Sequence, residues 1–257
     1  MAKKDVAVKK DNVVAINEEL EAAMAAASAE GHSDFTKDDM AIPFLRILQK
    51  MSPQLSRKEG EYIEGAQEGM IMNTVTGEIW EQETGLIVIP CKYIFKHILW
   101  KPRDSGGGFV QAFDKGASLP QTEKDERGRD ITGDGNILTP TAEYYVLVVS
   151  EDDGGIEPAL ISMSSSQLKV SRAWNAFIDQ QVFGPNKIQA LPYFNYYKLT
   201  TKDESNDQGS WCGWKWELHG AVADMNHFSA GKSFRATVEE GVVPTKYVED
   251  DPTADVM

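Results

Sequence analysis

The chain has 257 residues, of which 41% are hydrophobic, and its 40 acidic and 26 basic side chains give a net charge of −14. This length allows one large domain or two small ones with a sizeable core. No apolar run approaches the roughly 20 residues that span a bilayer, and the lysine-containing N-terminus has no apolar core segment, so we expect neither a membrane helix nor a secretory signal. Two cysteines, Cys91 and Cys212, imply no disulfide framework and favour buried free thiols in a reducing cytoplasm.

The first part of the chain is expected to be an appendage to a core domain. Residues 1–38 are predicted to form a flexible arm with a surface helix, because strong helix formers there come with little apolar surface. Residues 39–240 are the predicted core domain. It begins with the apolar segment 42–55, in which Pro53 stops any helix, and continues with a hairpin over 69–80.

Residues 85–103 are predicted to form the central strand. The apolar run Leu86–Ile89 is typical of a strand buried on both faces. Basic and aromatic side chains then alternate up to Arg103 with no acidic residue among them. Such a strand suits a surface that follows a phosphate backbone and stacks bases. The same pattern also fits an amphipathic strand with solvated lysines and core aromatics.

Further strands and two helices are predicted downstream. The strands are expected at 109–113, 142–150, 158–163, 193–202 and 210–218, where residues typical of strands occur in short runs. One helix is expected to run from a cap at Ser164–Ser166 to about residue 181, and another from 226 to 238. The polar stretch 114–139 is predicted to be a long loop, and residues 241–257 a disordered acidic tail.

This order of elements predicts a mainly β protein with added helices, in the α+β class. Strands outnumber helices and rarely alternate with them, which favours an antiparallel sheet closing into a barrel over a doubly wound fold. An OB-like β-barrel is the preferred architecture, although the strand count is equally compatible with a sandwich.

Two basic segments stand out in the acidic chain. Residues 85–103 carry four basic and no acidic side chains, and residues 164–202 carry five basic and one acidic. Both segments are rich in aromatic residues, which can stack on bases in any sequence. The alternative is that the tryptophans only plug the ends of the barrel. The candidate nucleic-acid-binding residues are Lys92, Tyr93, Lys96, Trp100, Lys101, Arg103, Tyr196, Lys198, Lys202, Trp211, Trp214 and Lys215.

Signatures of catalysis and of metal binding are absent from the sequence. There is no P-loop and no GxSxG elbow, and the four histidines form no ligand pattern. The segment Asp130–Asn136 has the spacing of a calcium loop, but Thr141 stands where a bidentate Glu is needed. We therefore expect no catalytic residues, no cofactor and no metal, and a protein that is not an enzyme.

The acidic C-terminal residues are expected to bind partners. A flexible tail with Glu249, Asp250, Asp251 and Asp255 can attract basic proteins or compete for a basic groove. The alternative is an unstructured end that only improves solubility.

Four segments resemble proteins of tailed bacteriophages: IPFLRILQKMSPQ (42–54), GMIMNTVTGEIW (69–80), GLIVIPCKY (85–93) and WKPRDSGGGFV (100–110). The resemblance is to a group associated with single-stranded DNA binding in the replication and recombination gene cluster. The acidic tail also resembles those by which phage and bacterial single-stranded DNA-binding proteins recruit polymerase and helicase. It departs from them by ending Asp255-Val256-Met257, without a terminal Phe.

Together these observations predict a non-catalytic phage protein that binds single-stranded DNA in the host cytoplasm. Phosphates would contact the basic side chains and bases would stack on the aromatic ones. Phage replication proteins are expected as partners of the tail, and a homo-oligomer is left open. One alternative is a virion or assembly protein that uses its aromatic sheet as an oligomer interface. Another is an enzyme or accessory factor with the 114–139 loop as a lid.

Overall fold

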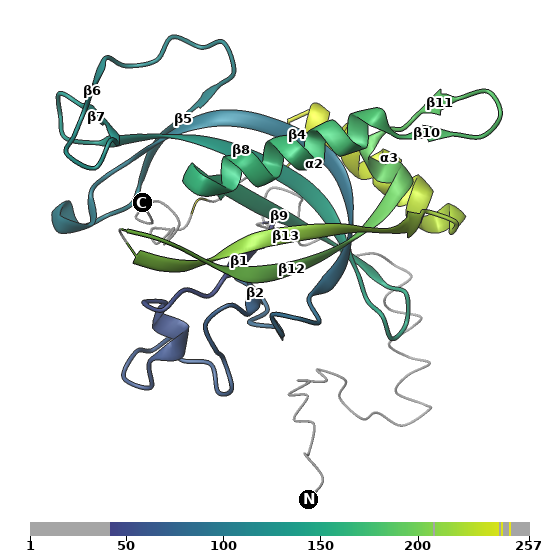
Figure 1. Ribbon diagram of the computed structural model, residues 1–257, viewed down its shortest axis with the longest axis horizontal. Helices are drawn as coiled ribbons and strands as arrows, with labels where there is room; N and C mark the ends of the chain where they lie inside the picture. Colours follow the sequence, from purple (N-terminus) through teal and green to yellow (C-terminus); the bar gives the residue numbers. More distant parts are fainter. Residues whose placement is uncertain (1–41, 208, 242, 244–246, 248–257) are drawn as a thin grey trace, which may run out of the picture.

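The computed structural model describes residues 42–207, 209–241, 243 and 247 (Figure 1). The predicted arm and the acidic residues Glu249, Asp250, Asp251 and Asp255 lie outside these residues. Within them the chain forms a sheet of 11 strands, curled into a half-barrel, together with a two-stranded hairpin and two α-helices. The structure therefore confirms a mainly β protein with added helices.

The bounds of the elements are as follows. The large sheet contains β1 (Phe44–Ile47), β2 (Ile71–Asn73), β3 (Ile79–Trp80), β4 (Leu86–Trp100), β5 (Phe109–Asp114), β6 (Thr122–Lys124), β7 (Asp130–Thr132), β8 (Ile137–Val149), β9 (Ile156–Ser164), β12 (Asn195–Asn206) and β13 (Gly209–Ala221). The separate hairpin is β10 (Val182–Phe183) and β11 (Ile188–Gln189), and the helices are α2 (Leu168–Gln180) and α3 (Met225–Glu239). Short 3-10 turns are η2 (Pro53–Leu55), η3 (Arg103–Ser105), η4 (Ser165–Gln167) and η5 (Pro192–Phe194).

Strand β4 is the centre of the sheet, as its sequence predicts. The strand order is β13-β12-β4-β8-β9-β1-β2-β3, with β5 paired to β4 and the β6–β7 hairpin attached to β8. Every pairing is antiparallel except that of β1 with β9. Val88 and Ile89 are both fully buried, which confirms that this part of the strand is covered on both faces. The predicted hairpin over 69–80 is also present, as β2 and β3.

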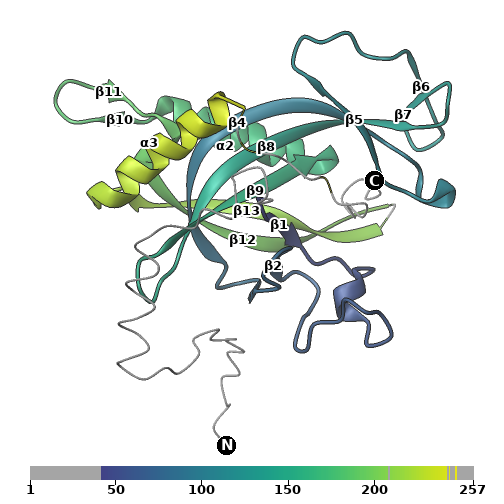
Figure 2. The same cartoon turned by 180° about the vertical axis from the view of Figure 1, so that it is seen from behind.

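The two helices cover opposite faces of the curled sheet (Figures 1 and 2). Helix α2 lies on the concave face, where Trp174 is fully buried against Tyr144 and Tyr197. Helix α3 lies on the convex face, over a second cluster that contains Ile89 and Cys91. Because side chains alternate along a strand, each strand residue can be assigned to one of these faces from its register.

Both cysteines are buried free thiols, as expected. Cys91 in β4 is fully buried and Cys212 in β13 is 5% exposed. Burial raises the pKa of each thiol to about 12, so both are protonated at neutral pH.

Two predictions about local structure need correction. The stretch 114–139 is not one loop, because it contains the β6–β7 hairpin and the start of β8. These short strands are mostly polar, and β6 is largely exposed, so they lack the apolar alternation that reveals a strand. The serines at 164–166 do not cap α2; they end β9 and form η4, and Gln167 precedes the helix without a side-chain capping bond.

Two glutamine side chains close the gap between β13 and the other end of the curled sheet. Among the described strands β13 pairs only with β12, which leaves its outer edge without a strand partner. Gln49, just after β1, donates to the Cys212 carbonyl at 2.8 Å and accepts from the Cys212 N–H at 2.9 Å. Gln167 accepts from the Trp214 N–H at 2.8 Å. We call these contacts the glutamine seam.

Replacing Gly85 by alanine is expected to destabilise the protein by at least about 2 kcal/mol. Gly85 has a φ of +59°, and a Cβ atom there would overlap the carbonyl oxygen of Leu199 in β12. Gly77→Ala is the matched control, because its φ is +71° but no atom lies within 4 Å of a Cβ. Chemical denaturation measures both variants; equal losses would show that the close approach of β4 and β12 is not the cause.

Candidate nucleic-acid interface

The second basic segment forms a surface on the β12–β13 hairpin. In the register, Lys198 faces Glu217, Thr200 faces Lys215, and Glu204 faces Trp211. Residues opposite one another share a face, so Lys198, Lys202, Lys215 and Trp211 all lie on the same face of the hairpin. We call this set, together with Lys169 of α2, the hairpin surface. The register with β4 pairs Lys198 with Ile87, which assigns the strand residues of the hairpin surface to the convex face; Lys169 reaches Glu204 on β12 from the start of α2.

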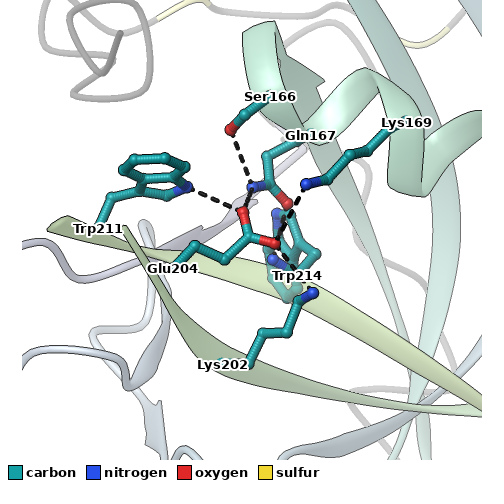
Figure 3. Close-up of polar contacts among 7 residues, drawn as sticks. All are labelled: Ser166, Gln167, Lys169, Lys202, Glu204, Trp211 and Trp214. Carbon is teal, nitrogen blue, oxygen red and sulfur yellow. Dashed lines mark hydrogen bonds and ion pairs between the residues drawn. The ribbon is translucent and has the colours of Figure 1, made fainter. Parts of the chain in front are cut away.

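At one end of the hairpin surface, polar side chains from β12, β13 and the start of α2 contact the carboxylate of Glu204 (Figure 3). Its Oε1 atom lies 2.9 Å from Lys202 Nζ and 3.7 Å from Lys169 Nζ. Its Oε2 atom accepts from Trp211 Nε1 at 3.0 Å and from Gln167 Nε2 at 3.3 Å. The indole of Trp211 is thereby held beside two ammonium groups that come from different elements.

Glu204 stays ionised while it holds these groups. Burial of the carboxyl favours its neutral form, but the bond to Lys202 and the charges of Lys202 and Lys169 outweigh burial and lower the pKa of Glu204. Lys202 and Lys169 remain 46% and 66% exposed at their side chains. Lys215 is 50% exposed and pairs with Glu217 at 2.7 Å. The hairpin surface thus carries four lysines against two glutamates.

Two aromatic candidates on the β12–β13 hairpin, Trp214 and Tyr196, are covered by other parts of the protein. Trp214 is 2% exposed and lies in the concave core, so its ring has no face open to a base and we remove it from the candidate interface. Tyr196 is half-buried on the convex face, where its hydroxyl bonds His227 Nδ1 of α3 at 2.9 Å. The alternation of the strand explains the difference between Trp211 and Trp214.

The first basic segment shares the convex face but is largely covered there. Lys92 pairs with Glu239 of α3 at 2.6 Å, and Arg235 reaches the same carboxylate at 3.0 Å. Lys96 lies 3.2 Å from Glu143, whose side chain is completely buried. Both lysines are engaged by carboxylates of the protein itself, and their side chains are only 25% and 15% exposed, so in this arrangement neither offers a free ammonium to a phosphate.

The end of β4 is more open. Trp100 is 6% exposed, with its ring edge against Phe109 of β5 at 6.1 Å between centroids. Lys101 and Arg103, which follow the strand, are both exposed, as is Phe109. Tyr93 lies on the concave face, 5.1 Å from Tyr144, and lines a cavity of about 430 Å³ together with Lys92.

Several residues of these sites are missing from the sequence-based candidates. Lys169 was detectable, because it belongs to the basic segment 164–202. Phe109 was detectable only as part of a predicted strand. Glu204 and Glu143 gave no signal, because acidic residues are typical of solvent-exposed chain.

The described residues contain no cluster of metal ligands and no helix that could span a membrane. Nowhere in 42–207, 209–241, 243 and 247 do three His, Cys, Asp or Glu side chains come together in a way that could hold a metal ion. No helix in the same ranges has the length and apolar character needed to cross a bilayer.

Comparison with known proteins identifies a family. A family model described as Pam3 phage gp34-like protein matches residues 9–244, which is most of the chain. This agrees with the resemblance to phage proteins in the sequence. No curated protein and no solved structure matches significantly.

Proposed function

The chain belongs to the Pam3 phage gp34-like family, and we propose that it binds single-stranded DNA without catalysing a reaction. The observation that carries this proposal is the hairpin surface, where four lysines from three elements share a surface with one indole, two of them beside it, in a chain of net charge −14. The half-barrel sheet is, in this proposal, a variant of an OB-like barrel that presents one hairpin to the strand.

Lysines in exposed ion pairs can exchange a carboxylate for a phosphate. The Lys202 and Lys215 side chains are 46% and 50% exposed, so a phosphate backbone can reach their ammonium groups and compete with Glu204 and Glu217 for them. The release of counterions from the nucleic acid then favours binding at low salt.

Trp211 supplies the stacking contact in this proposal. Its hydrogen bond to Glu204 fixes the indole before DNA arrives, which lowers the entropy lost on binding. A base stacked on an aromatic ring contributes about 1–3 kcal/mol whatever its sequence, so the interface would bind without sequence preference.

The biological setting is part of the same proposal. The protein would act in phage replication or recombination, in the host cytoplasm. The residues Glu249, Asp250, Asp251 and Asp255 would contact basic replication proteins through long-range attraction. The alternative role in assembly needs an exposed aromatic sheet, and the burial of Trp174, Tyr197 and Trp214 in the protein's own core argues against it.

Titration with oligo-dT tests the proposal directly. Tryptophan fluorescence at low salt is expected to be quenched, and Trp211→Phe should remove most of the quenching because Trp211 carries the stacking contact. Trp80→Phe is the matched control, since the Trp80 ring packs against the concave core and not on the hairpin surface. A folded protein whose fluorescence does not respond to the oligonucleotide at low salt would refute the proposed function.

A further inference from the structure

Tyr247 is inserted into a cluster of aromatic rings at the end of β4. Its ring stacks on Phe109, with 4.6 Å between centroids and 15° between planes. Trp100 stands edge-on to it at 6.1 Å and 90°, and Phe44 lies at 6.1 Å. We call Phe44, Trp100 and Phe109 the aromatic cage. It brings together rings from β1, β4 and β5 around a residue that follows α3 in the sequence.

Two charged groups receive the polar end of Tyr247. The phenol hydroxyl donates to Glu143 Oε1 at 2.6 Å, and Lys96 Nζ donates to the hydroxyl at 3.3 Å. The ammonium also lies 5.9 Å from the centroid of the tyrosine ring. Burial and the neighbouring Glu143 raise the pKa of Tyr247, so the phenol is neutral at physiological pH. The cage therefore holds a neutral ring with an acceptor and a donor at its polar end.

These features match a nucleobase as well as they match a phenol. Parallel stacking on an exposed phenylalanine is the contact that single-stranded nucleic acids make with their proteins. A pyrimidine has a six-membered ring like that of tyrosine, and its edge carries both hydrogen-bond donors and acceptors. Glu143 could accept from such an edge while Lys96 donates to it. Lys101, which follows Trp100, is exposed at the cage and available to a phosphate.

We propose that the aromatic cage is a binding site for a pyrimidine base of single-stranded DNA, and that Tyr247 fills it when no DNA is bound. The inference rests on the proposed function, because it adds a second contact point to the hairpin surface on the same convex face. In it Tyr247 and the base compete for one site. The apparent association constant for DNA at the cage is then the intrinsic constant multiplied by the fraction of molecules in which Tyr247 has left the cage.

The test compares oligo-dT binding by the full-length protein and its Tyr247→Ala and Tyr247→Phe variants, using fluorescence anisotropy of a labelled oligonucleotide. Tyr247→Ala is expected to bind at least about fivefold more tightly than the unchanged protein, because the competing ring is gone. Tyr247→Phe keeps the stacked ring and should stay closer to the unchanged protein. Circular dichroism melts of all three confirm that the proteins compared are folded.

Two double variants check that the gain in DNA affinity comes from the aromatic cage. Adding Phe109→Ala to Tyr247→Ala should abolish the gain, because the stacking surface is lost. Adding Phe113→Ala, on the same strand but outside the cage, should leave the gain intact. The gain in affinity should be smaller for oligo-dA than for oligo-dT, since a purine is larger than the tyrosine ring that the cage holds.

The outcomes separate this inference from the function on which it rests. Tighter binding by Tyr247→Ala that depends on Phe109 supports both. Binding by the unchanged protein with no gain, or a loss, in folded Tyr247→Ala overturns the cage and leaves the proposed function standing. If neither the unchanged protein nor any folded variant binds at low salt, both are overturned.

Discussion

Replacing Lys198, Lys202 and Lys215 together by alanine is expected to weaken oligo-dT binding about a hundredfold at 50 mM salt. Each contact between a lysine and a phosphate of a single strand contributes about 0.7 to the slope of log affinity against log salt, so the slope should fall by about 2. The fold should survive, because the Lys215 pair is exposed and Glu204 keeps Lys169, Trp211 and Gln167 as partners when Lys202 is removed.

Affinity measured at four or more salt concentrations decides this prediction. A control variant in which Lys50, Lys58 and Lys115 become alanine removes the same charge from exposed positions outside the hairpin surface. If the control loses as much affinity as the test variant, attraction depends on net charge alone and the hairpin surface is not the binding site.

Replacing Glu143 by alanine is expected to cost about 3–5 kcal/mol of unfolding free energy. The Glu143 side chain is completely buried, and it pairs with Lys96, whose own side chain is only 15% exposed. Removing the carboxylate leaves the Lys96 ammonium without its paired carboxylate in a poorly hydrated site, and Tyr247 loses its acceptor. Urea denaturation at pH 7 measures the change.

Two controls identify the cause. Glu217→Ala breaks an exposed pair with Lys215 and should change the unfolding free energy far less than Glu143→Ala does. The double variant Lys96→Met with Glu143→Leu removes both charges and should be clearly more stable than Glu143→Ala alone. A double variant that is no better than the single one would mean that packing, and not the unpaired charge, dominates the loss.

The sequence predicted the parts of the fold that follow from hydrophobic pattern. Strand β4 was expected from the apolar run that begins at Leu86, and α2 from the apolar stripe that contains Trp174 and Ile178. The β6–β7 hairpin was missed because its short, mostly polar strands show no apolar alternation, although Thr132 is buried. The parallel pairing of β1 with β9 joins residues more than 100 positions apart, which no local pattern encodes.

The candidate interface was predictable as a set of residue types but not as a surface. Alternation along β13 correctly separates Trp211 from Trp214, although only the structure says which side is solvent. Lys92 and Lys96 look alike in the sequence, and their partners Glu239 and Glu143 come from distant elements. Tyr247 shows the same limit, because its contacts depend on where α3 directs the chain.

The glutamine seam also bears on how this protein meets other copies of itself. A sheet edge with unbonded N–H and C=O groups is a template on which another chain can add a strand, and this is a common route to aggregation. On β13 the N–H and C=O of Cys212 and the N–H of Trp214 are already bonded to Gln49 and Gln167. The protein therefore protects this edge with side chains, and strand exchange there would first have to break bonds that the folded monomer already makes.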